Sequence, residues 1–135
     1  ISDPQWFLRM ALNLAEPLAA AGEPAEVGRA WRMHPADPGP LLAGLAHGAA
    51  GIALAFAALA AIDPEQAEHW HGLAAEARAF ERIHVSSHRG SWADLRTQGD
   101  SSGPASCPHF WCHGSVGIAH ERLLAWRAHP GDALI

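Results

Sequence analysis

Apolar residues recur along the chain in patterns that predict four helices. In residues 3–22 they return every three or four positions, the period of an amphipathic helix, and Asp3 followed by Pro4 is typical of a helix start. Residues 41–62 carry no Asp, Glu, Lys or Arg, which predicts a helix over about 48–61 that is apolar on every side. This stretch is long enough to cross a membrane, but its alanine and glycine content favours a buried helix over a membrane span.

The other two helices follow from start signals. Asp63-Pro64-Glu65-Gln66 has the capping-box spacing, so a helix is expected from there to about residue 83, and a last helix is expected over about 114–128. Residues 23–40 contain four prolines and read as a linker with a short helical turn, and residues 86–110 read as a long loop. The apolar positions expected on the buried stripes are Trp6, Phe7, Met10, Ala11, Leu14, Leu18, Trp70, Leu73, Ala74, Ala77, Phe80, Ile83, Ile118, Leu123, Leu124 and Trp126.

The order of these helices predicts an all-α fold. Amphipathic helices alternate with apolar ones, as outer and inner helices do in an α/α barrel or toroid, and the chain supplies about two helical hairpins of one. The net charge of −5, without a Lys/Arg cluster, argues against nucleic acid as a partner. Two cysteines are too few for a disulfide framework, and no signal peptide is recognised, so we expect a cytoplasmic protein.

One motif occurs twice. Residues 47–53 and 113–119 both read H-G-x-x-G-I-A, 66 positions apart, and each stands where a helix is expected to begin. Glycine permits close backbone approach at a helix start, and the first N–H groups of a helix are left without partners inside it. A helix start of this kind that also carries His or Cys is a natural place for a site.

The residues of these motifs resemble those of a known family. Gly44-Leu45-Ala46-His47-Gly48-Ala49-Ala50-Gly51-Ile52 and Trp111-Cys112-His113-Gly114-Ser115-Val116-Gly117-Ile118 are similar to two signatures of the lanthionine synthetase C-like cyclases. Together with Ser91-Trp92-Ala93-Asp94-Leu95-Arg96, they are most similar to the cyclase domain of class II lanthipeptide synthetases. The resemblance implies that residues 1–135 are part of an α/α toroid. It departs from the class II pattern at Val116, where Pro is usual.

The resemblance also implies a reaction and a metal. Such cyclases add a peptide cysteine thiolate to dehydroalanine or dehydrobutyrine and so form thioether rings, with a central Zn²⁺ that lowers the pKa of the thiol. Cys112 corresponds to one zinc ligand, and His47 to the histidine that acts as acid or base. The later Cys-His ligand pair has no counterpart in this sequence, so the zinc site is incomplete in this chain and we expect the chain alone to be inactive.

Each of these residues has a simpler structural interpretation. Cys112 could be a small buried residue at a crowded helix start, and His47 a core histidine bonded to the backbone. His113 is expected to be structural or to support the ligand, with a substrate contact as the alternative. Asp94 and Arg96 are expected to form an ion pair that orders the long loop, again with a substrate contact as the alternative.

The metal site and the function each admit a second interpretation as well. Cys107, His109, Cys112 and His113 supply four zinc-type donors within a short segment, although adjacent Cys and His have difficulty in reaching one tetrahedral ion. Besides a cyclase, the chain could be a non-catalytic helical module that binds peptides, or less favourably an α/α-barrel carbohydrate enzyme, which needs paired acids. The expected partners are the dehydrated precursor peptide, the rest of the parent synthetase, and a second copy of the chain through uncovered positions such as Leu54, Phe56 and Leu59.

Overall fold

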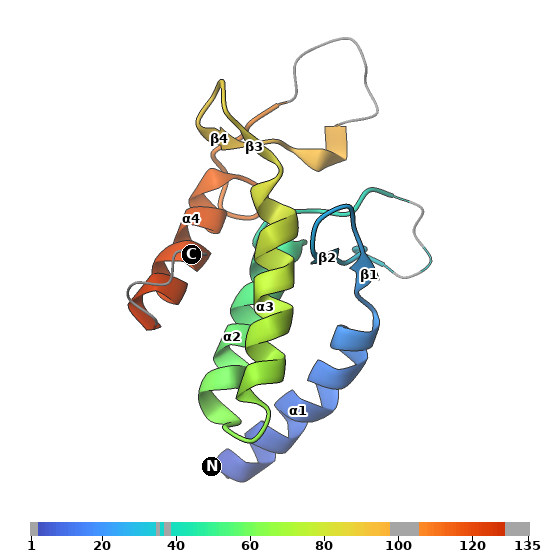
Figure 1. Ribbon diagram of the computed structural model, residues 1–135, viewed down its shortest axis with the longest axis vertical. Helices are drawn as coiled ribbons and strands as arrows, with labels where there is room; N and C mark the ends of the chain where they lie inside the picture. The colour runs from blue at the N-terminus through green and yellow to red at the C-terminus, as the bar shows by residue number, and fades with distance from the viewer. Residues whose placement is uncertain (1–2, 35, 37–38, 98–105, 129–135) are drawn as a thin grey trace.

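The computed structural model describes residues 3–34, 36, 39–97 and 106–128, and its main elements are four helices. Helices α1 and α3 run in the direction opposite to α2 and α4 (Figure 1). The all-α prediction is therefore confirmed, while a closed toroid remains a prediction. The helices are α1 (Pro4–Ala20), α2 (Ala49–Ile62), α3 (Ala67–Arg82) and α4 (Ser115–Ala128).

The centre of the molecule is the α2–α3 pair, which packs through aromatic rings. The Phe56 ring stacks on Trp70, with centroids 5.8 Å apart and an angle of 8° between the planes, and Trp31 packs on the other side of Phe56. The two indole N–H groups donate hydrogen bonds, Trp31 to the Leu18 carbonyl at 2.7 Å and Trp70 to Asp63 at 2.9 Å. Burying these rings therefore leaves neither indole nitrogen without a partner.

Charged residues join α3 to α4. Arg78 donates two hydrogen bonds to Glu121, at 2.9 and 2.8 Å, and Arg122 donates one to Glu81. Both glutamates are fully buried. Burial raises the pKa of Glu81 to about 7, and the charge of Arg122 opposes this increase. The α3–α4 contact thus rests on buried ion pairs, whereas the α2–α3 contact rests on stacked rings.

The apolar stripe expected on α1 is exposed. The helix begins as predicted, since Asp3 accepts a hydrogen bond from the N–H of Gln5 at 3.0 Å. However, only Ala15 is fully buried in α1, while Ala11, Leu12, Leu18 and Ala19 are partly buried against the core. Most of the larger apolar side chains of the first three turns face solvent. The exposed ones are Trp6, Phe7, Met10 and Leu14.

Segments expected to be irregular contain short hairpins. Strands β1 (Glu23–Pro24) and β2 (Arg29–Ala30) are antiparallel, and Gly28 takes a left-handed φ of 71° in the turn that joins them. The helical turn expected around residues 27–31, all of which the structure describes, does not form, because these residues belong to the hairpin turn, strand β2 and the coil after it. A second hairpin, β3 (Val85–Ser86) and β4 (Ser91–Trp92), and a 3₁₀ turn η1 (Leu95–Thr97) occupy the start of the expected long loop.

Helix α3 begins three residues later than the sequence predicts. Asp63 does not cap it: one of its oxygens accepts the Trp70 indole N–H, and Gln66 stands at the cap position without a capping bond from its side chain, whose amide donates to Asp63 at 3.4 Å. The other positions predicted on its apolar stripe are buried, but Ile83 is instead 45% exposed because it lies just past the last helical residue. On the other two helices, Phe56 and Leu59 are buried rather than uncovered, while Leu123 and Trp126 are exposed.

Helix α2 lies within the apolar stretch 41–62, and both of its ends are one residue from the bounds predicted for it. The residues before it form an irregular segment that bonds to the helix start, since the N–H groups of Ala49 and Ala50 donate to the carbonyls of Leu42 and Ala43. Within the described part of the chain, no helix is long and apolar enough to cross a membrane.

Candidate functional site

The two copies of the repeated motif form the same backbone structure at the starts of α2 and α4. The N–H of Ala49 donates to the Leu42 carbonyl at 2.9 Å, and the N–H of Ser115 donates to the Pro108 carbonyl at 3.2 Å. These two bonds are related by the same 66-position offset as the motifs. Each helix start is therefore closed by the carbonyl seven residues before it.

The motif glycines are required by this structure. A Cβ at Gly51 would lie 1.9 Å from the Leu45 carbonyl oxygen, and a Cβ at Gly117 would lie 1.9 Å from the Trp111 carbonyl oxygen. Such distances are far below contact distance, and the obstacle is backbone that cannot rotate away. Because the two clashes are again 66 positions apart, the repeat seen in the sequence is also a structural repeat.

A hydrogen bond joins the two helix starts directly. The N–H of Ala46 donates to the carbonyl of Cys112 at 2.9 Å, and a Cβ at Gly44 would lie 2.7 Å from that same oxygen. Ala46 and Cys112 are equivalent positions of the two motifs. The backbone of Cys112, in the second motif, is therefore bonded to the backbone of the first motif.

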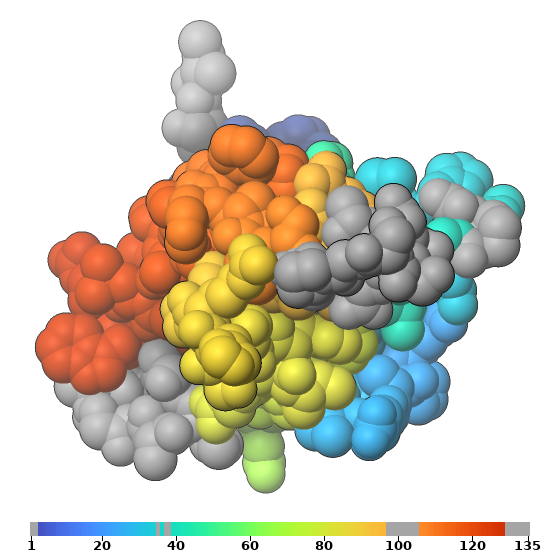
Figure 2. Space-filling view, turned by 90° about the horizontal axis from the view of Figure 1, so that it is seen from above, coloured from blue at the N-terminus to red at the C-terminus, as the bar shows by residue number. Residues whose placement is uncertain are grey.

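Cys112 is half-buried and lies against the next side chain. Its sulfur is 2.8 Å from Nδ1 of His113, and the two cysteines of the chain form no disulfide. Nearby, Nδ1 of His109 is 2.7 Å from the hydroxyl oxygen of Ser115, the first residue of α4. The segment before α4 therefore holds two pairs of an imidazole with a thiol or hydroxyl group. In Figure 2 this segment (orange) lies beside the β3–β4 hairpin (yellow).

Four of the five candidate residues line one cavity. This main cavity, of about 250 Å³, has His47 from the first motif and His113 from the second on its walls, together with Asp94 and Arg96. Cys112 is not among its lining residues but directly precedes one of them. The remaining wall is largely apolar and includes Met33, Leu42, Ala43, Leu95 and Ile118.

Asp94 and Arg96 form the ion pair that the sequence predicts. Arg96 donates through Nε at 2.9 Å and Nη2 at 2.6 Å to the two carboxylate oxygens of Asp94. These hydrogen bonds lower the pKa of the Asp94 carboxyl, although burial acts in the opposite direction, and the positive charge of His113 lowers it further. The same bonds raise the pKa of Arg96, and negative charge on Cys112 contributes to this effect. Asp94 is 6% exposed, so the guanidinium is held by a buried and ordered carboxylate.

The described residues fit the zinc implied by the resemblance only in part. The thiol of Cys112 is a ligand type that zinc favours. Among the residues that the structure describes, however, no group of three or more His, Cys, Asp or Glu side chains could hold a metal ion. This also leaves the local arrangement of Cys107, His109, Cys112 and His113 without support, since His109 pairs instead with Ser115. One candidate ligand is present, and a complete ligand set is absent from this part of the chain.

One residue on the cavity wall has no signal in the sequence. Met33 is 61% exposed and stands on the wall of the main cavity beside His47, although it belongs to the segment expected to be a linker. Its position depends on the β1–β2 hairpin, which no periodic pattern of apolar residues in the sequence predicts.

The fold and the site define a helical protein in which two equivalent helix starts hold a cysteine and two histidines near one cavity. A sequence profile of the family described as lanthionine synthetase C-like protein matches residues 2–135. The chain belongs to that family. No curated protein and no solved structure matches the chain significantly.

Proposed function

We propose that the chain is part of a zinc-dependent lanthipeptide cyclase, of the kind found in class II synthetases, that forms thioether rings in a dehydrated precursor peptide. The observation that carries this proposal is the main cavity, where His47 and the Asp94–Arg96 pair converge next to Cys112 in a member of this family. The proposed location is the cytoplasm, and the proposed partners are the peptide and the rest of the synthetase.

The reaction sets clear demands on the protein. The sulfur of a peptide cysteine bonds to the β-carbon of dehydroalanine or dehydrobutyrine, and the electrons of the double bond move to the amide as an enolate. The α-carbon then takes up a proton, so that the thiol proton is returned overall. Zinc, when bound, holds the peptide thiol as a thiolate.

The residues of this chain suit the remaining steps. His47 is exposed on the wall of the main cavity, where an imidazole can take the thiol proton and deliver a proton to the α-carbon. Arg96 presents a fixed positive charge to the same cavity, which stabilises the developing enolate oxygen. Asp94 acts through Arg96, because its two oxygens fix the orientation of the guanidinium.

Cys112 is the proposed zinc ligand of this chain, with His113 in support. The remaining ligands of the proposed site lie outside the described residues. Elemental analysis of the full-length protein that contains this chain is expected to find one zinc that Cys112→Ala removes and Cys107→Ala retains. Zinc retained in Cys112→Ala would exclude the assigned ligand.

Ring formation tests the proposal directly. A ring blocks alkylation of the peptide cysteine, so mass spectrometry after alkylation counts rings. In the full-length protein, His47→Asn is expected to slow cyclisation about 10²–10⁴-fold, and Arg96→Gln about 10²-fold through kcat rather than KM. His69→Asn changes an exposed histidine of α3 outside the cavity and serves as the control. An unchanged rate in both site variants would contradict the proposal.

A non-catalytic peptide-binding module is the second candidate. It is favoured by one observation, namely the lack of a three-donor group among the described residues. In that case the full-length protein binds the dehydrated peptide without zinc and forms no ring.

A further inference from the structure

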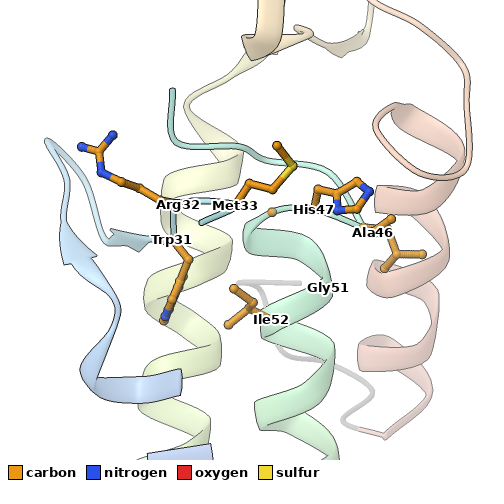
Figure 3. Close-up of a pocket in the computed structure, with 9 residues that line it drawn as sticks. Trp31, Arg32, Met33, Ala46, His47, Gly51 and Ile52 are labelled. Atoms are coloured by element: carbon orange, nitrogen blue, oxygen red, sulfur yellow. The ribbon is translucent and has the colours of Figure 1, made fainter. Parts of the chain in front are cut away.

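A second cavity lies on the other side of His47. It has a volume of about 320 Å³, and its walls include Trp31, Met33, Ala46, His47 and Ile52. Met33 and His47 line both cavities, so these two side chains form a ridge between them. Figure 3 shows the two side chains next to each other above the first turn of α2.

Five of the side chains that line this second cavity are apolar, namely Trp31, Met33, Leu45, Ala46 and Ile52. Trp31 is 4% exposed, and the one polar atom of its side chain donates a hydrogen bond to the Leu18 carbonyl. Arg32 also lines the cavity, but its guanidinium forms two hydrogen bonds with Glu23, at 2.7 and 3.0 Å, and a further one with the Gly39 carbonyl. In Figure 3 that guanidinium points away from His47. The stem of Arg32, rather than its charge, therefore faces the cavity, and His47 is the remaining polar side chain on the wall.

We infer that this second cavity binds the aliphatic side chain of the substrate residue next to the dehydroamino acid. The inference rests on the proposed function and adds a determinant of substrate choice to it. In an extended peptide, successive side chains point to opposite sides of the backbone. A peptide whose backbone runs along the Met33–His47 ridge therefore places the dehydroamino acid in the main cavity and its neighbour in the second cavity. Burial of a leucine side chain there is favourable, while burial of an amide without a partner is not.

Two labelled pentapeptides test this inference. Each has a central dehydroalanine and no cysteine; one carries leucine on both sides of it, and the other carries asparagine, which has a similar shape but is polar. Fluorescence anisotropy with the full-length protein that contains this chain is expected to give about tenfold tighter binding of the leucine peptide. Equal affinities would overturn the inference.

Ala46 allows the second cavity to be filled without touching the first. It is exposed, and it lines the second cavity but not the main one. Ala46→Leu is expected to abolish the tenfold preference for the leucine peptide and to leave the asparagine peptide unchanged. Ala61→Leu, at the exposed far end of α2, makes the same change away from both cavities and should keep the preference. A preference retained in Ala46→Leu overturns the inference.

Met33→Ala provides a second test, because this exposed side chain can be shortened without opening the core. Loss of the ridge is expected to reduce the preference about threefold; an unchanged preference in both this variant and Ala46→Leu counts against the second cavity. A further peptide, with alanine in place of dehydroalanine, separates the two proposals. If leucine is preferred but dehydroalanine binds no better than alanine, the proposed function fails while the apolar subsite stands. If no peptide binds, both fail.

Discussion

The starts of α2 and α4 share one backbone structure and differ in chemistry. In both, a carbonyl seven residues upstream closes the helix, and a glycine lies directly over a second carbonyl. At the position where the first start has Ala46, the second has Cys112. His47 is exposed between two cavities, whereas His113, its equivalent, contacts the cysteine sulfur.

This difference shows how one scaffold can supply two roles. The glycines and carbonyls determine where each helix begins. The residue before the first glycine is histidine in both copies, while the one before it is alanine in the first copy and cysteine in the second. A thiol at one start and an accessible imidazole at the other then become neighbours through the bond from Ala46 to Cys112. The backbone is duplicated, and the reactive groups are divided between the copies.

The helices behind the two starts are fixed in different ways, and this gives the largest expected effect. Arg78→Met leaves the fully buried Glu121 without its main partner, and we expect the free energy of unfolding to fall by about 3–5 kcal/mol. Urea denaturation measures this loss. Arg9→Met, which breaks the exposed pair with Asp3, should cost less than about 1 kcal/mol. Equal losses would show that the buried Arg78–Glu121 pair stabilises the fold no more than an exposed pair does.

The equivalence of the two starts can be broken at their glycines. Gly51→Ala and Gly117→Ala each place a methyl group against a backbone carbonyl, so each should lower the free energy of unfolding by about 2–3 kcal/mol. Gly72→Ala on α3 meets nothing within 4 Å and should instead raise it by about 0.5–1 kcal/mol. If only one of the two motif variants is destabilised, the starts are not equivalent.

The ion-paired helix should also respond to pH in a way that the apolar pair does not. The pKa of Glu81 is about 7 in the folded chain against 4.5 when it is solvated, so the folded chain binds the proton more tightly. This contribution to the free energy of unfolding is therefore greatest at low pH, falls between about pH 4.5 and 7, and is lost above that range. Glu81→Gln should flatten this slope in thermal melts. The exposed substitution Glu65→Gln should keep it, and an unchanged slope in Glu81→Gln would contradict the assignment.

The smallest expected effect concerns a contact present only at the second start. His109 bonds to the hydroxyl of Ser115, and the first start has Ala49 in place of that serine. His109→Ala should lower the free energy of unfolding by roughly 0.5–1 kcal/mol, because both groups are partly solvated. His88→Ala, on the exposed β3–β4 turn, should change it little. A loss of several kcal/mol would mean that this contact supports the whole segment before α4.

The sequence predicted the two motif helices to within one or two residues, because glycine spacing and apolar runs are local signals that the fold obeys. It failed where tertiary contacts decide. A two-residue strand is too short to show the alternation of apolar and polar residues by which strands are recognised. The one sequence signal of the β1–β2 turn is Gly28, which takes a left-handed φ. The Asp63 carboxylate can either cap α3 or accept a hydrogen bond from the Trp70 indole. It accepts from the indole, because the buried ring needs a partner for its N–H. The apolar residues of α1 correctly predict a helix, but their spacing does not predict which part of the protein packs against them.

Much of the candidate site follows from the motifs, which point to His47, Asp94, Arg96 and His113, and the structure brings these four residues to one cavity. The ion pair was predictable because two residues of opposite charge stand two positions apart. The second cavity was not, because it depends on Trp31 and Met33, which come from a proline-rich segment whose path is set by the hairpin.

The bond from Ala46 to Cys112 joins a residue to its own counterpart in the next unit. The contact is head-to-tail, because an N–H of one unit meets a C=O of the next, and the packing around it carries a fixed rotation from one unit to the next. Repetition of the same contact generates a closed ring when that rotation divides a full circle, and an open spiral when it does not. The contact between the two helix starts thus sets the angular pitch of any larger assembly built from this unit.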